Sequence, residues 1–144
     1  MDAKEMMDAC LRRGACLRAS EMARGVSDWR DLSRLLFRSQ SREWCMRECF
    51  PGIDMFRRAP AEVRDYGVYV DAGDVVSHKR DTALIGETRG RVEADDTVHI
   101  YRVVVMHGAR AVVVARKGAV VHVALTADCA VETDADGSSR IYLE

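Results

Sequence analysis

The stretch that decides the fold is ARAVVVARKG (109–118), AVVHVALTAD (119–128), CAVETDADGS (129–138) and SRIYLE (139–144), which form rows that align without gaps. Columns of one parity hold small or apolar residues, and columns of the other parity mix charged with apolar residues. The small or apolar columns are Ala109/Ala119/Cys129/Ser139, Ala111/Val121/Val131/Ile141 and Val113/Val123/Thr133/Leu143. Alternation with period two is typical of a strand that buries one face. The rows therefore predict a stack of short β-strands.

Alternate rows resemble each other more than neighbouring rows do. The matching pairs are Val113/Thr133, Ala115/Ala135, Val121/Ile141, His122/Tyr142 and Val123/Leu143. This pattern predicts a two-strand coil that repeats every twenty residues, as in a flattened β-solenoid. The alternative is an antiparallel β-sandwich or roll, which the favoured hairpin pair Asp136-Gly137 supports. In both arrangements the filled inner columns leave little room for a cavity.

Residues 1–49 have the pattern of a helical hairpin. Asp2 followed by Glu5 predicts a capping box at the start of the first helix. Residues from Met7 to Arg18, including Leu17, follow the spacing of one helical face, and Gly14 lies in the middle of it. Because glycine lowers helix propensity, we expect Gly14 to mark a close crossing with the second helix.

The second helix of the hairpin is expected to start at Ser27 as its N-cap and to run as far as Cys49. Phe50-Pro51-Gly52 ends it, since the residue before a proline disfavours helical geometry. The shorter segments that follow are helical stretches over 53–58 and 60–65 and strands over 66–70, 82–85 and 89–94. We therefore predict an α+β fold with helices over residues 1–65 and a β-stack over residues 66–144, and we expect the hairpin to cap the open end of the stack.

The order of these parts resembles an uncharacterised group of small bacterial proteins associated with prophages or other mobile elements. The residues that carry the resemblance are Phe50-Pro51 after the hairpin, Met55-Phe56, YGVYVD (66–71) and AVVHV (119–123). The resemblance implies a protein that serves a mobile element or its host through contacts. Its motifs are structural, so they transfer no catalytic residue.

Composition narrows the classes of function. The net charge of −1 over 144 residues argues against a nucleic-acid partner. No apolar run approaches the roughly 18 residues that span a bilayer, so we expect no membrane association and a cytoplasmic protein. The five cysteines have irregular spacing and predict free thiols rather than a disulfide framework.

The cysteines and histidines that could bind a metal ion or act in catalysis form only weak motifs. Cys45 and Cys49 could share a helical face, but zinc needs about four ligands, and nothing supplies a second pair. Cys129 could meet His107 or His122, yet its column points inward, where a thiol is inert. We therefore expect no catalytic residue, no metal ion and no cofactor.

Two charged groups have ordinary interpretations as well. The carboxylates of Glu132, Asp134 and Asp136 fit a solvated strand rim better than a cation site. In the cluster His78-Lys79-Arg80, the adjoining Asp81 favours neutralisation within the turn over phosphate binding.

The residues that we predict as a binding face are Arg102, Val112, His122, Glu132 and Tyr142, a mixed outer column that contains aromatic and arginine side chains typical of binding hot spots. The alternative is that the protein's own helical hairpin packs there. The sequence thus favours a non-enzymatic interaction or assembly module that binds a protein partner or itself, as a homo-oligomer. A small-ligand-binding protein with a pocket between helices and β-stack is the second hypothesis, and an enzyme of unrecognised class is the third.

Overall fold

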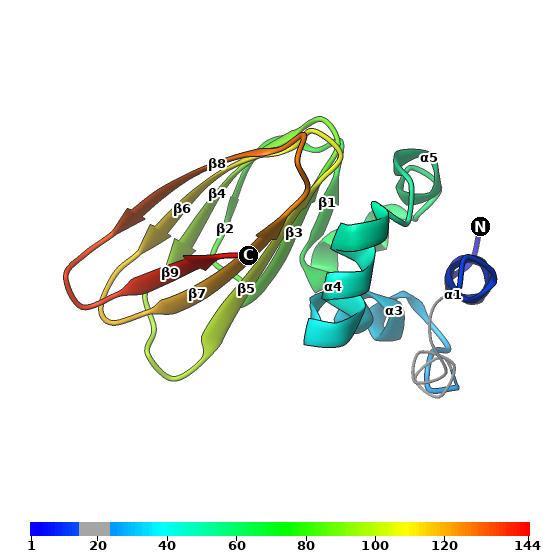
Figure 1. The fold of residues 1–144 in the computed structure, drawn as a ribbon, viewed down its shortest axis with the longest axis horizontal. Helices are drawn as coiled ribbons and strands as arrows, with labels where there is room; N and C mark the ends of the chain where they lie inside the picture. Colours follow the sequence, from blue (N-terminus) through cyan, green and yellow to red (C-terminus); the bar gives the residue numbers. More distant parts are fainter. Residues whose placement is uncertain (15–23) are drawn as a thin grey trace.

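The computed structural model describes residues 1–14 and 24–144 and shows short helices followed by a parallel β-solenoid (Figure 1). The strands form two sheets that face each other. The five-stranded sheet contains β1 (Val68–Val70), β3 (Asp81–Ile85), β5 (Ile100–Met106), β7 (Val120–Leu125) and β9 (Arg140–Leu143). The four-stranded sheet contains β2 (Gly73–Ser77), β4 (Thr88–Ala94), β6 (Arg110–Ala115) and β8 (Ala130–Ala135).

The strand pairing confirms the solenoid and shows that the antiparallel sandwich or roll is wrong. Each neighbouring pair in both sheets is parallel, and the register sets Val113 beside Thr133 and Val121 beside Ile141. Asp136-Gly137 makes no hairpin. Its turn, closed by the Ser139 amide on the Asp136 carbonyl, instead carries the chain from one sheet to the other.

The regular repeat begins only at β5. Ile100 pairs with Val120, twenty residues along, whereas Val68 pairs with Ala83, only fifteen residues along. The first coil is therefore shorter than the later ones. This irregularity explains why β2, which no row pattern indicated, was missed from the sequence.

Tight turns with left-handed backbone connect the sheets where the repeat is most regular. His107 and Gly108 have φ values of 59° and 84°, and Lys117 and Gly118 have values of 58° and 78°. Two successive positive φ angles define a type I′ turn, in which glycine adopts the second position without strain. The inner residues that follow these turns, Ala109 and Ala119 among them, are fully buried in the core between the sheets.

The helical part consists of α1 (Ala3–Arg12), α3 (Trp29–Phe37), α4 (Ser39–Glu48), the short α5 (Ile53–Phe56) and the 3-10 helix η1 (Ala61–Tyr66). The Asp2 half of the predicted capping box is confirmed, since the Asp2 carboxylate accepts a hydrogen bond of 2.8 Å from the Glu5 amide. The second cap is Asp28, which accepts from the Asp31 amide at 2.9 Å, and not Ser27.

The helices differ from the expected hairpin in two places. Gly14 follows the end of α1 with a φ of +104°, and a Cβ atom added there would have no described neighbour within 4 Å, so no close helix crossing at Gly14 is seen among the described residues. Arg38 has extended geometry, which divides the predicted second helix into α3 and α4. Leu17 and Arg18, which were assigned to the first helical face, lie outside the described residues.

The helices cover the outer face of the five-stranded sheet rather than the end of the stack, and α1 lies farthest from it (Figure 1). Leu36, Phe37 and Phe56 pack on Ile85 and Met106 in a second apolar cluster, separate from the one between the sheets. The expectation that the hairpin caps the open end is therefore wrong. Within the described ranges, no helix has the length and apolar character needed to cross a membrane.

Candidate functional site

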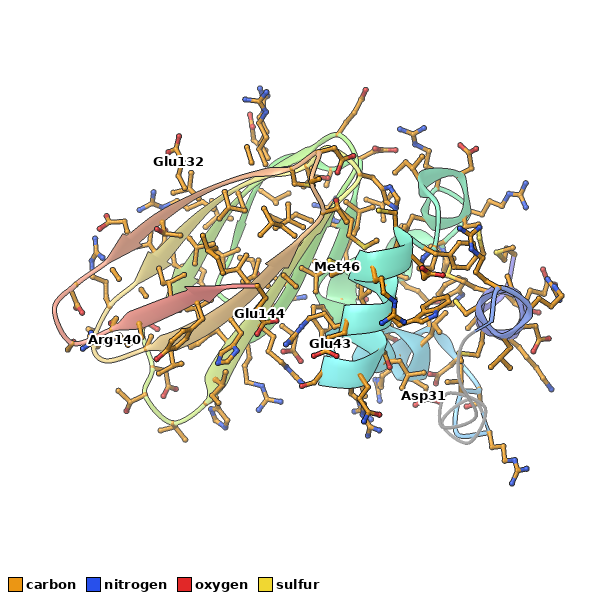
Figure 2. The ribbon with its side chains drawn as sticks, viewed as in Figure 1. Asp31, Glu43, Met46, Glu132, Arg140 and Glu144 are labelled. Carbon is orange, nitrogen blue, oxygen red and sulfur yellow. The ribbon has the colours of Figure 1, made fainter. Side chains whose placement is uncertain are left out.

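The solenoid separates the residues predicted as one binding face. Arg102, His122 and Tyr142 lie side by side across β5, β7 and β9. Val112 and Glu132 pair across β6 and β8 in the other sheet. Because successive rows enter opposite sheets, the outer residues of neighbouring rows point in opposite directions. Figure 2 shows Glu132 projecting from β8 away from the side where Glu144 meets the helices.

The first of these groups contributes to the attachment of the helices. The Arg102 guanidinium donates to both carboxylate oxygens of Asp81, at 2.8 and 2.9 Å, and to the Phe37 carbonyl at the end of α3 at 3.2 Å. Arg42, on α4, donates to the same carbonyl at 3.4 Å and to Glu144 at 3.0 Å. Arg102 therefore follows the alternative interpretation of the predicted face, in which the protein's own helices pack there.

His122 and Tyr142 lie at the border of this attachment. The His122 Nδ1 atom lies 3.0 Å from the Glu144 carboxylate, and its ring centroid lies 5.3 Å from that of Tyr142. Tyr142 is 50% exposed. Only the edge of the predicted face on this sheet therefore remains open to solvent.

Val112 and Glu132 belong to a solvated outer face of the four-stranded sheet. The register continues from Val112 to Arg91 and Val76. Arg91 in turn pairs with Glu93 at 3.0 Å. This face has the mixed charge of an ordinary protein surface.

Among the hydrogen bonds of the described residues, none joins Cys129 to either histidine that could have activated it. Its Sγ atom lies 3.3 Å from the Thr126 hydroxyl and 3.6 Å from the Asp128 carboxylate, and burial raises its pKa. The Nε2 atom of His107 lies 2.7 Å from the Pro51 carbonyl. A thiol with a raised pKa carries little thiolate and is a poor nucleophile near neutral pH.

The helical cysteines occupy contrasting sites. Burial raises the pKa of Cys45 to about 12 and that of Cys10 to about 11, whereas Cys49 is exposed at the end of α4. Among residues 1–14 and 24–144, no group of three or more histidine, cysteine or acidic side chains is arranged to hold a metal ion.

The acidic residues of the last coil are held by local donors. The Arg116 guanidinium donates to the Asp134 carboxylate at 2.7 Å. Asp136 accepts from the Ser138 hydroxyl at 2.8 Å and from the Lys117 amide at 3.0 Å, and these bonds, the one from Ser138 first, hold its pKa well below the usual range. These carboxylates thus have structural roles in the stacking of the turns.

The basic cluster 78–80 is also engaged within the fold. The Lys79 ammonium donates to the Arg64 and Asp65 carbonyls at 2.7 and 3.1 Å, where η1 ends. Lys79 and Arg64 also lie over the ring of Tyr69, which is 8% exposed. Arg64 and Lys79 thereby cover the ring of Tyr69 on β1, the first strand of the five-stranded sheet.

No described residue covers the last coil of the solenoid in this way. In the preceding coil the inward positions are buried, whereas the same positions of the last coil are half-buried or exposed. Leu143, for example, is 57% exposed, whereas its partner Val123 in the preceding coil is buried. The buried positions of the preceding coil are Ala111, Val113, Ala115, Val121 and Val123, and their partners in the last coil are, in the same order, Val131, Thr133, Ala135, Ile141 and Leu143. The apolar interior of the solenoid is therefore open at this end.

The open end also presents free backbone groups. The amides of Ala130 and Asp136 donate hydrogen bonds to the carbonyls of Ala109 and Ala115 in the preceding coil. Since backbone direction alternates along a strand, the amides of Val131, Thr133 and Ala135 face the open edge. In β9 the amides of Arg140 and Glu144 likewise donate to the preceding coil. The amides of Ile141 and Leu143 therefore face the open edge. We call this surface the open end. It consists of the free edges of β8 and β9 and the inward-pointing side chains of the last coil, which are Val131, Thr133, Ala135, Ile141 and Leu143.

The sequence contained a partial signal of the open end. Val112, Val113 and Val114 of one row become Glu132, Thr133 and Asp134 two rows later, so the row that forms β8 is less apolar than the row that forms β6. A separate cavity of about 350 Å³ lies among the helices, with Val68 of β1 at its floor.

No family model, curated protein or solved structure matches the chain.

Proposed function

We propose that this protein is a non-enzymatic assembly module that forms a homodimer through the open ends of two solenoids. The observation that carries the proposal is the exposure of Leu143 and Thr133 at positions that the preceding coil buries. Burial of apolar surface is the main driving force of association. A second copy supplies both the missing apolar cover and the missing hydrogen-bond partners.

Antiparallel pairing of β8 with β9 of the second copy satisfies the edge of each strand. The outward residues of β8 include Glu132 and Asp134, and those of β9 include Arg140 and Tyr142. Pairing β8 with β9 sets the two carboxylates opposite Arg140 and Tyr142 of the second copy. Pairing β8 with itself would instead set carboxylates against each other, which is unfavourable. Charge thus favours the mixed pairing.

This geometry gives a closed dimer rather than a filament. A head-to-tail contact would repeat without limit only if the N-terminal end of the solenoid were equally open. At that end of the five-stranded sheet, Arg64 and Lys79 lie over the ring of Tyr69 on β1. An isologous contact between two C-terminal ends uses the open surface of each copy once.

The test is sedimentation equilibrium of the wild type and of two lysine variants over a range of concentrations. Leu143→Lys introduces a charge at the open end, and the proposal expects it to shift the chain from dimer to monomer. Val76→Lys is the matched control, because Val76 is 58% exposed, as Leu143 is at 57%, but lies on the outer face of β2. This control is expected to remain a dimer.

A monomeric wild type at every concentration would overturn the proposal. In that case the polar residues of β8 would act as a terminal cap that keeps a solitary solenoid soluble, a role that end repeats have in other solenoids. Circular dichroism of each variant establishes that a monomeric species is folded.

The proposal also includes the cellular compartment and the biological role of the dimer. The free thiols of Cys10 and Cys45 support a reducing compartment, and we place the protein in the cytoplasm on that ground. The resemblance to prophage-associated proteins supports a role in a mobile element or its host.

A further inference from the structure

The cavity among the helices is lined mainly by apolar side chains. Helices α1, α3 and α4 form its walls, and α5, η1 and β1 close one side. The apolar residues include Met6, Met7, Leu32, Leu36, Phe56, Val63 and Val68. Its volume of about 350 Å³ falls in the range of small-molecule sites. We refer to it as the helical chamber.

The helical chamber contains a polar group that the fold leaves unused. Ser33 is 6% exposed and lines both the chamber and a smaller cavity of about 200 Å³ beside it. In the part of the chain that the structure describes, no hydrogen-bond partner is found for its hydroxyl group. The hydroxyl oxygen is not itself fully buried, so it is open to a hydrogen bond with a ligand in the cavity.

Among the described residues that line the chamber, the charged ones lie at its rim. Glu43 and Arg47, both on α4, are exposed to solvent. A charged ligand inside would lose its hydration with no buried partner of opposite charge among the described lining residues, which is strongly unfavourable. The chamber therefore favours an uncharged molecule.

We propose that the helical chamber binds an uncharged aromatic compound of about two fused rings that carries one hydrogen-bonding group for Ser33. An apolar protein cavity of about 150 Å³ is large enough to bind benzene. The chamber has roughly twice that volume, and Trp29 and Trp44 give it aromatic walls against which a flat ring can pack. This site is separate from the open end, and its occupation does not depend on dimer formation.

The test is isothermal titration calorimetry with 2-naphthol as the probe. We expect saturable binding to the full chain, and binding of 2-naphthoate, which has the same rings and a negative charge, at least about 100-fold weaker. Ser33→Ala is expected to weaken 2-naphthol binding roughly tenfold by removing one hydrogen bond. Ser138→Ala makes the same chemical change at a distant turn and is expected to leave the affinity unchanged.

The tryptophans report where the probe binds. The chain has two tryptophans, and both line the helical chamber, so 2-naphthol should shift both indole N–H signals in a nitrogen–proton correlation spectrum. Absence of heat and of indole shifts would overturn the proposal, as would equal affinity of the wild type and a folded Ser33→Ala variant. The titration is repeated on Leu143→Lys, where unchanged binding supports the independence of the chamber from the open end.

Discussion

Arg42 on α4 and Glu144 after β9 form an ion pair of 3.0 Å that joins the helices to the last strand of the solenoid. Arg42 is 5% exposed, and its other terminal nitrogen donates to the Phe37 carbonyl. Figure 2 shows Glu144 between the end of β9 and α4. The ion pair therefore ties α4 to the residue that follows β9.

Replacing Glu144 by alanine should destabilise the protein, because it leaves the buried Arg42 guanidinium without its carboxylate. We expect a loss of about 1–3 kcal/mol in the free energy of unfolding, measured by urea denaturation. Glu87→Ala, which removes an exposed carboxylate between β3 and β4, is the control and should change stability by less than about 0.5 kcal/mol. Equal effects of the two substitutions would show that the Arg42 ion pair contributes nothing.

Gly90 lies in the inner column of β4, where no side chain fits. A Cβ atom there would lie 2.5 Å from Cδ1 of Leu84, which is fully buried. Gly90→Ala should cost about 1–3 kcal/mol by overpacking, and Leu84→Val in the same chain should recover part of that loss. Gly137→Ala, where the added Cβ has no close neighbour, is the control. Additive effects of the Gly90 and Leu84 substitutions in urea denaturation would contradict the predicted clash.

Asp136 should make stability depend on pH in the acid range. Its pKa is lower in the folded chain than the value of about 3.9 for an unfolded aspartate, so below that value the unfolded state binds more protons and stability falls with falling pH. Asp136→Asn should therefore reduce the loss of stability between about pH 5 and pH 2, measured by urea midpoints. Ser138→Ala, which removes the chief hydrogen bond, should reduce it in part. An unchanged pH profile in both variants would contradict the role of these bonds.

Thiol labelling should distinguish the cysteines of the helices. At pH 8, Cys49 should react quickly with iodoacetamide, whereas Cys10 and Cys45, with pKa values of about 11 and about 12, should react only when the helical part opens. Peptide mass mapping assigns each site, and Cys49→Ser should remove the fast phase. Rapid labelling of Cys45 in the native chain would show that the wall of the helical chamber is open.

Much of the solenoid could be predicted from its rows because stacked coils repeat the same environment. Val121 and Ile141 occupy the same inward position one coil apart, and the spacing alone gives their register. The first coil could not be predicted, since its shorter length removes the repeat that identifies strands such as β2.

The sites were less predictable because they depend on how the layers meet. His122 and Val112 are neighbours in the row pattern, yet they lie on opposite sheets, so the predicted binding face is divided. The helical chamber depends on the angle between α1, α3 and α4, which helical spacing does not specify. Exposure of Leu143 depends on the absence of a covering coil in the structure, while its own sequence context is that of a core strand.

Amide hydrogen exchange at the open end tests the proposed dimer most directly. The amides of Val131, Thr133, Ala135, Ile141 and Leu143 face the edge and have no partner strand within the described chain. The account predicts that these amides become protected as the protein concentration rises and exchange quickly in Leu143→Lys, while amides of β2 exchange at the same rate at all concentrations. Equally fast exchange of the edge amides in dilute and concentrated wild-type protein would contradict it.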